Sequence, residues 1–417
     1  MQPSRNATRF AFIMITSLFF MWGFVHNLDP VLIRHLKKSF SLSTLQSSLV
    51  DSAVFIAYFV MALPAGFIIK KYGYKAGIIT GLAFFAIGSF LFIPAANTQQ
   101  YTFFLMALFI IACGLTILET AANPYATLLG NPTTATLRLN LAQSFNGLAA
   151  ALAPIIGVHI IIIKGFSDDA LNAMSASAKQ VALASEAASV KGPYFTLGCV
   201  IVVIALIFAF LKLPEIRQKT ETAPAKSILQ TLRHKHLLAA VITQFFYVGA
   251  QVCVLSFFIL FAEKVSGLDT ATAGLYLGLG CGMAFMIGRF IGTLIMVVIK
   301  PTKLLMLYSF MCVLLSIVAI TSHGMIPVYA VIGIAFFMSI MFPTIFSLGI
   351  KELGSDTELG SSLIIMSIVG GALLPPVLGY ISDVTHNIQL GYIVPLVCFV
   401  VVFWFGWKGH VVKGIKN

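Results

Sequence analysis

Twelve long apolar runs dominate this chain of 417 residues. A helix needs about 20 predominantly apolar residues to cross a bilayer, and each run has that length. The chain is 59% hydrophobic and only 10% charged, which is far from the balance of a soluble domain. The alternating ten-residue segments of a membrane β-barrel are missing, so we predict an all-α membrane protein with twelve transmembrane helices. The runs centre near Leu18, Tyr58, Phe84, Phe109, Leu152, Val202, Gly249, Met283, Met311, Ala335, Ile368 and Val400.

The basic residues indicate how such a chain would be oriented. There are 26 Lys and Arg against 14 Asp and Glu, which gives a formal net charge of +12. In a soluble protein this excess would suggest a nucleic-acid partner, but cytoplasmic loops of membrane proteins are also rich in Lys and Arg. A cytoplasmic N-terminus places most of these residues in cytoplasmic loops. We therefore expect a multi-pass protein in a lipid bilayer with both termini cytoplasmic and with no nucleic-acid partner.

A polar, basic segment at residues 211–235 divides the runs into two sets of six. We predict an N-terminal six-helix bundle at residues 1–212, a cytoplasmic linker at 213–235 and a C-terminal six-helix bundle at 236–417. Two bundles that rock about a site at the membrane midplane are typical of secondary transporters. A second long connection, residues 165–192, is rich in Ala and Ser, and its middle predicts a surface helix.

The motifs of soluble enzymes do not occur. The chain has no GxxxxGK[ST], GxSxG or HExxH sequence, so we expect neither ATP-driven pumping nor enzymatic activity, and no cofactor. Its six cysteines are scattered one to an apolar run, whereas metal and disulfide frameworks need clustered thiols. We interpret them as small packing residues.

Glu119 lies inside the apolar stretch 103–125. An ionisable group at such a position is expensive to hold and marks a pathway, a proton site or a ligand contact. Asn123 follows four residues later on the same helical face, and Pro124 interrupts the backbone pattern directly after it. The alternative is that Glu119 only pairs with a basic group. Arg289, in the eighth run, is expected either to neutralise a carboxylate or to hold a neighbouring helix.

Amide side chains recur along the fifth run. Asn140, Gln143 and Asn146 stand at three-residue steps and predict a polar stripe whose donors and acceptors suit hydroxyl groups. The alternative is that these amides join neighbouring membrane helices.

The seventh run repeats this pattern with Gln244, Tyr247 and Gln251. Amides bind sugar hydroxyls, and the neighbouring aromatic residues Phe245 and Phe246 could cover the C–H surface of a sugar ring. The composition favours a carbohydrate ligand, with helix packing again the alternative.

Acidic residues also occur in the first two runs. Asp29 either ends the first helix or faces the interior, and Asp51 is either a helix cap or an interior acid. Two interior carboxylates would share a proton or attract a cation. Asp29, Asp51 and Asn27 could together supply the several oxygens that sodium needs, so both proton and sodium coupling stay open, with the proton favoured.

Four sequences carry a resemblance to a known family: ILETAANPY, RLNLAQSFN, QFFYVGAQ and FMSIMFPTIFSLGIKELG. With these in order, the chain resembles the fucose–hexose:proton symporter family of the major facilitator superfamily over essentially its whole length. The resemblance implies two six-helix halves around a central cavity that opens alternately to the two sides of the membrane. It also implies a sugar importer of a bacterial inner membrane.

The resemblance further implies roles for single residues. Glu119 matches the family's acidic residue at the sugar and proton site, Gln143 and Asn146 match polar residues that face the cavity, and Asn123 belongs to the same signature. The first-helix acid departs from the pattern, because NLDP stands where NLND is found and Asp29 lies one residue early.

We therefore predict a secondary active importer of a neutral monosaccharide, a hexose or deoxyhexose, that acts as a monomer and is driven by protons. Asp29, Asp51 or Glu119 would carry the coupling ion. Sodium coupling is the alternative within this class, and a sugar receptor that does not transport is the alternative from another class. The predicted sugar contacts are Glu119, Asn123, Gln143, Asn146, Gln244, Tyr247 and Gln251.

Overall fold

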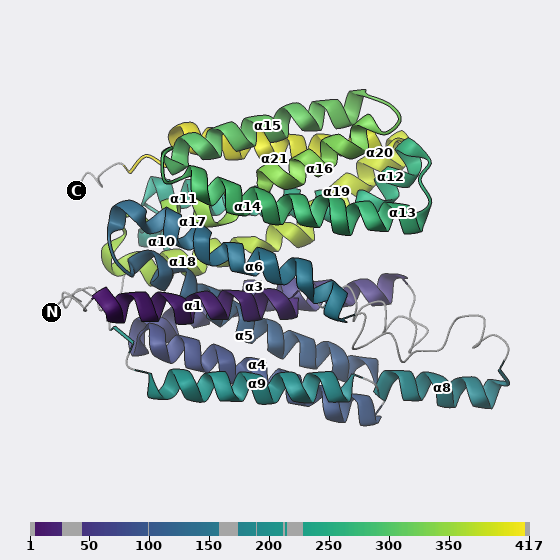
Figure 1. Ribbon diagram of the computed structural model, residues 1–417, viewed down its shortest axis with the longest axis horizontal. Coiled ribbons are helices and arrows are strands. Elements are labelled where there is room, and N and C mark those ends of the chain that lie inside the picture. Colours follow the sequence, from purple (N-terminus) through teal and green to yellow (C-terminus); the bar gives the residue numbers. More distant parts are fainter. Residues whose placement is uncertain are drawn as a thin grey trace.

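The computed structural model describes residues 5–26, 44–98, 100–157, 174–188, 190–211, 213–214 and 228–412. Within these ranges the regular structure is entirely helical, and the long helices run nearly parallel or antiparallel to one another (Figure 1). Eleven described segments are long and apolar enough to cross a membrane. The prediction of an all-α membrane protein is confirmed.

The described residues of the first half of the chain, here called the N half, form six long helices and one surface helix. α6 is the long helix of this half outside the set of eleven, and within its described residues it carries Arg138, Asn140, Gln143 and Asn146. It corresponds to the fifth predicted run and completes the twelve. The Ala-rich connection forms the surface helix α8. The bounds are α1 (Arg5–His26), α3 (Thr44–Tyr72), α4 (Tyr74–Thr98), α5 (Tyr101–Leu128), η1 (Pro132–Thr134), α6 (Ala135–Gly157), α8 (Ala176–Ala188) and α9 (Lys191–Phe210).

The second half, here called the C half, has more interrupted helices. The tenth predicted run is split between α16 and α17, just before Pro343, which has no N–H to continue the helical ladder. The bounds are α10 (Ile228–Thr231), α11 (Lys235–Ser256), α12 (Phe258–Ser266), α13 (Thr270–Leu275), η3 (Tyr276–Gly282), α14 (Met283–Ile295), α15 (Pro301–Thr321), α16 (Ile326–Met338), α17 (Met341–Gly349), η4 (Gly354–Asp356), α18 (Thr357–Met366), η5 (Ser367–Val369), α19 (Gly370–Thr385), α20 (Ile388–Gly391), α21 (Ile393–Trp404) and η6 (Phe405–Gly409).

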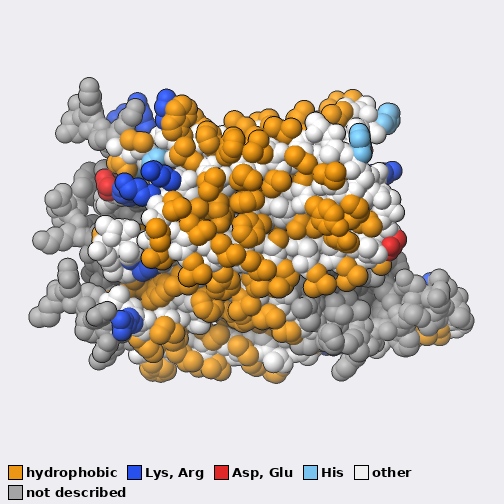
Figure 2. Space-filling model, turned by 45° about the horizontal axis from the view of Figure 1, so that its top comes forward, with side chains coloured by type: hydrophobic (Ala, Val, Ile, Leu, Met, Phe, Trp, Pro, Cys, Tyr) orange, Lys and Arg blue, Asp and Glu red, His pale blue; other side chains and the backbone are white. Residues whose placement is uncertain are grey.

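Each half packs around its own buried helices. In the N half α5 lies against α3 and α4, while α6 lies against α1. In the C half α11 lies against α19 and α21, and α15 against α16 and α21. The outer faces expose a broad band of apolar side chains, as lipid contact requires (Figure 2).

The start of α1 and the C-terminal end of the described chain lie at the same end of the molecule, on the left of Figure 1. We call this the terminal end. Figure 2 shows Lys and Arg side chains gathered there, at one border of the apolar band. Exposed basic residues of this end include Lys70, Lys71, Lys300, Lys303 and Lys408.

The halves meet through a set of polar contacts near the terminal end. Among the described residues, hydrogen bonds between the two halves lie on the part of their helices closer to that end. The bonds are Thr136 Oγ1 to Ser347 Oγ (2.9 Å), Asn140 Nδ2 to Thr344 Oγ1 (3.2 Å), Ser144 Oγ to Thr293 Oγ1 (3.4 Å), Arg289 Nη1 to the Gln143 carbonyl (2.8 Å), Tyr74 OH to Glu358 Oε1 (3.3 Å) and Ser361 Oγ to the Thr120 carbonyl (3.0 Å). The molecule is therefore in a state in which the two halves are joined at the terminal end.

Arg289 on α14 is buried at this junction, with 4% of its surface exposed. Its Nε donates to the Ser339 carbonyl (2.8 Å) in its own half, and Nη1 crosses to the Gln143 carbonyl on α6. The guanidinium carbon lies 4.5 Å from the centre of the Phe285 ring. Of the two expectations for Arg289, the structure supports the one in which it holds neighbouring helices, because its hydrogen bonds go to backbone carbonyls.

Replacing Arg289 by Lys should destabilise this junction. A single ammonium cannot reproduce the planar fork that reaches two carbonyls, and a lost hydrogen bond to a charged group costs about 1.5–3 kcal/mol. We expect Arg289→Lys to lower the melting temperature of the purified protein in detergent. Arg233→Lys, at an exposed position, is the matched control, and equal melting temperatures of the two variants would contradict this account.

Candidate functional site

Glu119 lies on α5, half-buried, with its carboxylate turned toward α3. Its Oε1 accepts a hydrogen bond of 2.6 Å from the hydroxyl of Tyr58 on α3. In the described part of the chain no Lys or Arg lies within ion-pair distance of it. The described residues therefore do not support the alternative in which Glu119 only pairs with a basic group.

Asn123 and Gln143 form the next pair of contacts. Asn123 is fully buried one helical turn after Glu119, and its Oδ1 accepts from Nε2 of Gln143 on α6 at 3.2 Å. The Nδ2 of Asn123 is buried and has no hydrogen-bond partner among the residues that the structure describes. A buried donor without a partner costs about 1–3 kcal/mol, so this amide is suited to a ligand or an ordered water that supplies an acceptor.

Glu119 and Asn123 together offer complementary hydrogen-bonding groups on one face of α5. Four residues of helix separate them by about 6 Å. The carboxylate is an acceptor and the free amide N–H is a donor, which is a combination that can bind adjacent hydroxyl groups on one small ligand.

The three amides of α6 do not all face this pair. Each three-residue step turns a side chain by about 300°, so the stripe rotates by about 60° per step around the helix. Asn140 consequently donates to Thr344 in the C half, and Asn146 donates to the Phe19 carbonyl on α1 at 3.2 Å. Gln143 is the member of the stripe that contacts Asn123. Helix packing thus accounts for the hydrogen bonds of two of these amides.

The predicted residues of α11 lie within the C half. Tyr247 is buried and its hydroxyl donates to the Met338 carbonyl at 3.0 Å, which ties α11 to α16. Gln244 is fully buried, and within the described ranges neither its oxygen nor its nitrogen has a hydrogen-bond partner. Gln251 is half-buried. No hydrogen bond among the described residues connects these three side chains to the Glu119 site.

The candidate ion-coupling residues of the first two runs cannot be placed. Asn27 and Asp29 lie outside the described residues. Asp51 belongs to α3, but its side chain lies outside the described part. Of the predicted ion-coupling residues, Glu119 is the one whose side chain the structure describes.

Tyr58 is a site residue that sequence reasoning did not select. A tyrosine in a membrane helix is commonly an interfacial residue, so the residue type gave no signal. The spacing did give a signal for Tyr58, because Asp51 and Tyr58 are seven residues apart and share a helical face. Which helix that face would meet could not be derived from spacing.

Comparison with known proteins identifies the family. The model of the Major Facilitator Superfamily matches residues 11–366. The chain is 39% identical to the L-fucose-proton symporter of Escherichia coli (strain K12), over 94% of this chain and 92% of the relative. It is 40% identical to a glucose/galactose transporter of Brucella abortus, over 96% and 94% of the two chains.

Solved structures agree. The crystal structure of the E. coli fucose:proton symporter, FucP, superposes with a TM-score of 0.90 at 38% identity, covering 97% of this chain and 99% of that one. A second crystal structure, described as FucP in the outward conformation, matches with the same TM-score, identity and coverage. The sequence match, the helical architecture and these relatives together show that the chain is a membrane transporter, not an enzyme, and that it belongs to the Major Facilitator Superfamily.

Proposed function

We propose that this protein imports a neutral monosaccharide by proton symport. The observation that carries the proposal is the half-buried Glu119 carboxylate, which has no cationic partner among the described residues and lies one turn from the unpartnered amide of Asn123. A carboxylate that is bonded only to a neutral hydroxyl can change protonation without breaking an ion pair. The names of the relatives, an L-fucose-proton symporter and a glucose/galactose transporter, support a hexose or deoxyhexose as cargo.

In this proposal the polar residues of both halves bind the sugar. Glu119 and Asn123 bind its hydroxyls, Gln143 orients Asn123, and Asn146 is a further sugar contact on α6. From the C half, Gln244 supplies a buried amide that lacks described partners in the present state, and Gln251 adds a second amide. Tyr247 fixes α11 to α16, so that Gln244 and Gln251 on α11 keep their orientation.

The coupling ion in the proposal is a proton. Proton transfer needs only one carboxylate, whereas sodium needs several oxygens close together. Glu119 is bonded to a hydroxyl and stands beside an amide, which suits a proton better. Two relatives, from E. coli and Haemophilus influenzae, are named proton symporters. We propose that Asp29 or Asp51 receives the proton from outside before Glu119 responds to it.

The closed terminal end indicates the access state. We propose that this end, and with it both termini, faces the cytoplasm. The basic residues gathered there support this, because cytoplasmic segments of membrane proteins are rich in Lys and Arg. The state with joined cytoplasmic ends is then outward-facing, in keeping with the similarity to FucP in the outward conformation. We propose a bacterial inner-membrane protein that functions as a monomer, because the sugar contacts all come from one chain.

Glu119→Gln should separate sugar exchange from proton-driven accumulation. The amide is a neutral isostere of the protonated acid, so uptake driven by an imposed pH gradient should be lost while counterflow of labelled sugar persists. Replacing a charge-assisted hydrogen bond by a neutral one should weaken sugar binding by about threefold to tenfold. Both are measured in proteoliposomes.

The matched control is Glu352→Gln, which removes an exposed carboxylate at the terminal end. It should leave accumulation and counterflow unchanged. Full proton-driven accumulation by Glu119→Gln would rule out Glu119 as the proton site. Sugar binding without any exchange in the unmodified protein would point instead to a receptor.

A thermal-shift screen with L-fucose, D-glucose and D-galactose should identify the cargo. A ligand at about 100 times its dissociation constant stabilises the folded state by about 2.7 kcal/mol, so the transported sugar should raise the melting temperature and the others should not. Sugars that fail this screen should also fail to compete in the uptake assay.

An imposed sodium gradient at constant pH tests the ion. We expect it to leave the rate of sugar uptake unchanged, while an inward proton gradient accelerates uptake. Acceleration by sodium that Asp51→Asn abolishes would overturn proton coupling in favour of a sodium site.

A further inference from the structure

Pro124 leaves one carbonyl of α5 without its helical donor. In an α-helix each carbonyl accepts from the N–H four residues later, and proline has no N–H. α5 continues through Pro124 to Leu128, so the carbonyl of Thr120 lacks this donor. Thr120 is fully buried, which keeps water from replacing the missing hydrogen bond, and it is the residue next to Glu119.

A serine of the C half donates a hydrogen bond to that carbonyl. Ser361 on α18 is fully buried, and its hydroxyl donates to the Thr120 carbonyl at 3.0 Å. The helices approach closely at this point, because Gly66 on α3 has no side chain and a Cβ there would overlap the side chain of Ser362. The contact therefore joins the C half directly to the helix that carries Glu119.

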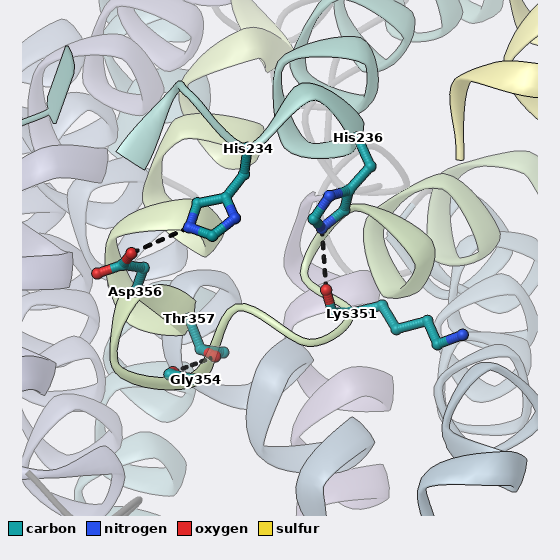
Figure 3. A network of polar contacts seen from close by, with 6 residues as sticks. All are labelled: His234, His236, Lys351, Gly354, Asp356 and Thr357. Atoms are coloured by element: carbon teal, nitrogen blue, oxygen red, sulfur yellow. Dashed lines mark hydrogen bonds and ion pairs between the residues drawn. The ribbon is translucent and has the colours of Figure 1, made fainter. Parts of the chain in front are cut away.

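Polar contacts at its start tie α18 to the rest of the C half (Figure 3). His234, directly before α11, lies with Nε2 3.2 Å from Oδ2 of the buried Asp356, and Nε2 of His236 lies 2.9 Å from the Lys351 carbonyl. The hydroxyl of Thr357 donates to the Gly354 carbonyl and closes the turn. Because of these bonds, α18 should move with the C half when the two halves separate.

The C half also contains a carbonyl that has lost its helical donor to a proline and is bonded by a side chain instead. Pro343 leaves the Ser339 carbonyl without its helical donor, and Nε of Arg289 donates to that carbonyl instead. Nη1 of the same Arg289 then crosses to the N half. At both sites a carbonyl freed by proline is bonded by a side chain from another helix, and that side chain belongs to the junction of the two halves.

We propose that Ser361 is a positioning residue that sets the balance between the two access states. Its hydroxyl satisfies the Thr120 carbonyl only while the terminal ends are together, so the missing N–H of Pro124 makes the closed terminal end more stable. The sugar and proton site on α5 is thereby linked to the opening of that end. This inference rests on the alternating access of the proposed function.

A double-mutant cycle of Ser361→Ala and Pro124→Ala tests the proposal. Spin labels at Tyr72→Cys and Lys351→Cys, both exposed at the terminal end on opposite halves, report the separation of the halves in a Cys199→Ser background without sugar. Ser361→Ala should raise the ratio of open to closed molecules by about threefold to tenfold, the effect of one lost hydrogen bond. In the Pro124→Ala background the new backbone N–H replaces the missing donor, and Ser361→Ala should change the ratio by less than about twofold.

Two further variants keep the test decisive. Ser316→Ala removes a buried hydroxyl of the C half that donates to the Cys312 carbonyl of its own helix, and it should leave the distances unchanged. Ser361→Thr keeps the hydroxyl and should stay close to the unmodified protein, whereas a purely steric role would make it at least as disruptive as Ser361→Ala. Equal effects of Ser361→Ala with and without Pro124 would overturn the proposal, as would no effect at all.

The distances do not depend on which sugar is carried. A shift caused by Ser361→Ala in a protein that transports none of the sugars would refute the proposed function and leave the positioning role intact. If the protein transports a sugar but Ser361→Ala leaves the distances unchanged, the proposed function stands and the positioning role of Ser361 is refuted.

Discussion

Water is scarce in the interior of a bilayer, so each polar group there has to be satisfied by the protein itself. This constraint explains why every regular element of the described chain is a helix, in which the backbone bonds itself. It also gives unusual weight to prolines, because each one removes a donor from that ladder. Thr120 and Ser339 carry two of the carbonyls that lose their donor in this way, and both are bonded by side chains at the junction of the halves.

The buried polar side chains fall into two groups under the same constraint. Most are bonded to another helix or to their own, such as Tyr247 to Met338 and Asn146 to Phe19. A few keep atoms without a partner in the described part of the chain, notably Asn123 and Gln244. The first group fixes the helices, whereas the second carries an energetic cost that a ligand, a water or the other access state can relieve. Function is best sought among the second group.

Much of the architecture could be predicted because it depends on hydrophobic length alone. The helical class and the family follow from apolar runs and four local motifs, and the break near Pro343 follows from a missing N–H. The special status of Glu119 was also predictable, because a carboxylate in an apolar run is costly wherever its helix packs. The contacts at this site were not predictable, since Tyr58 lies 61 positions from Glu119 and Ser361 lies 241 positions from Thr120 in the chain.

The sequence by itself determined that the chain is a membrane bundle of twelve helices and that Glu119 and several amides lie within its apolar runs, because both follow from local composition and helical period. Only the tertiary structure decided what each buried group contacts. It directed the amides of α6 to three different neighbours and Arg289 to two carbonyls rather than to a carboxylate. The physical reason is that a helix presents groups in all directions, and the packing of the two halves selects which groups meet.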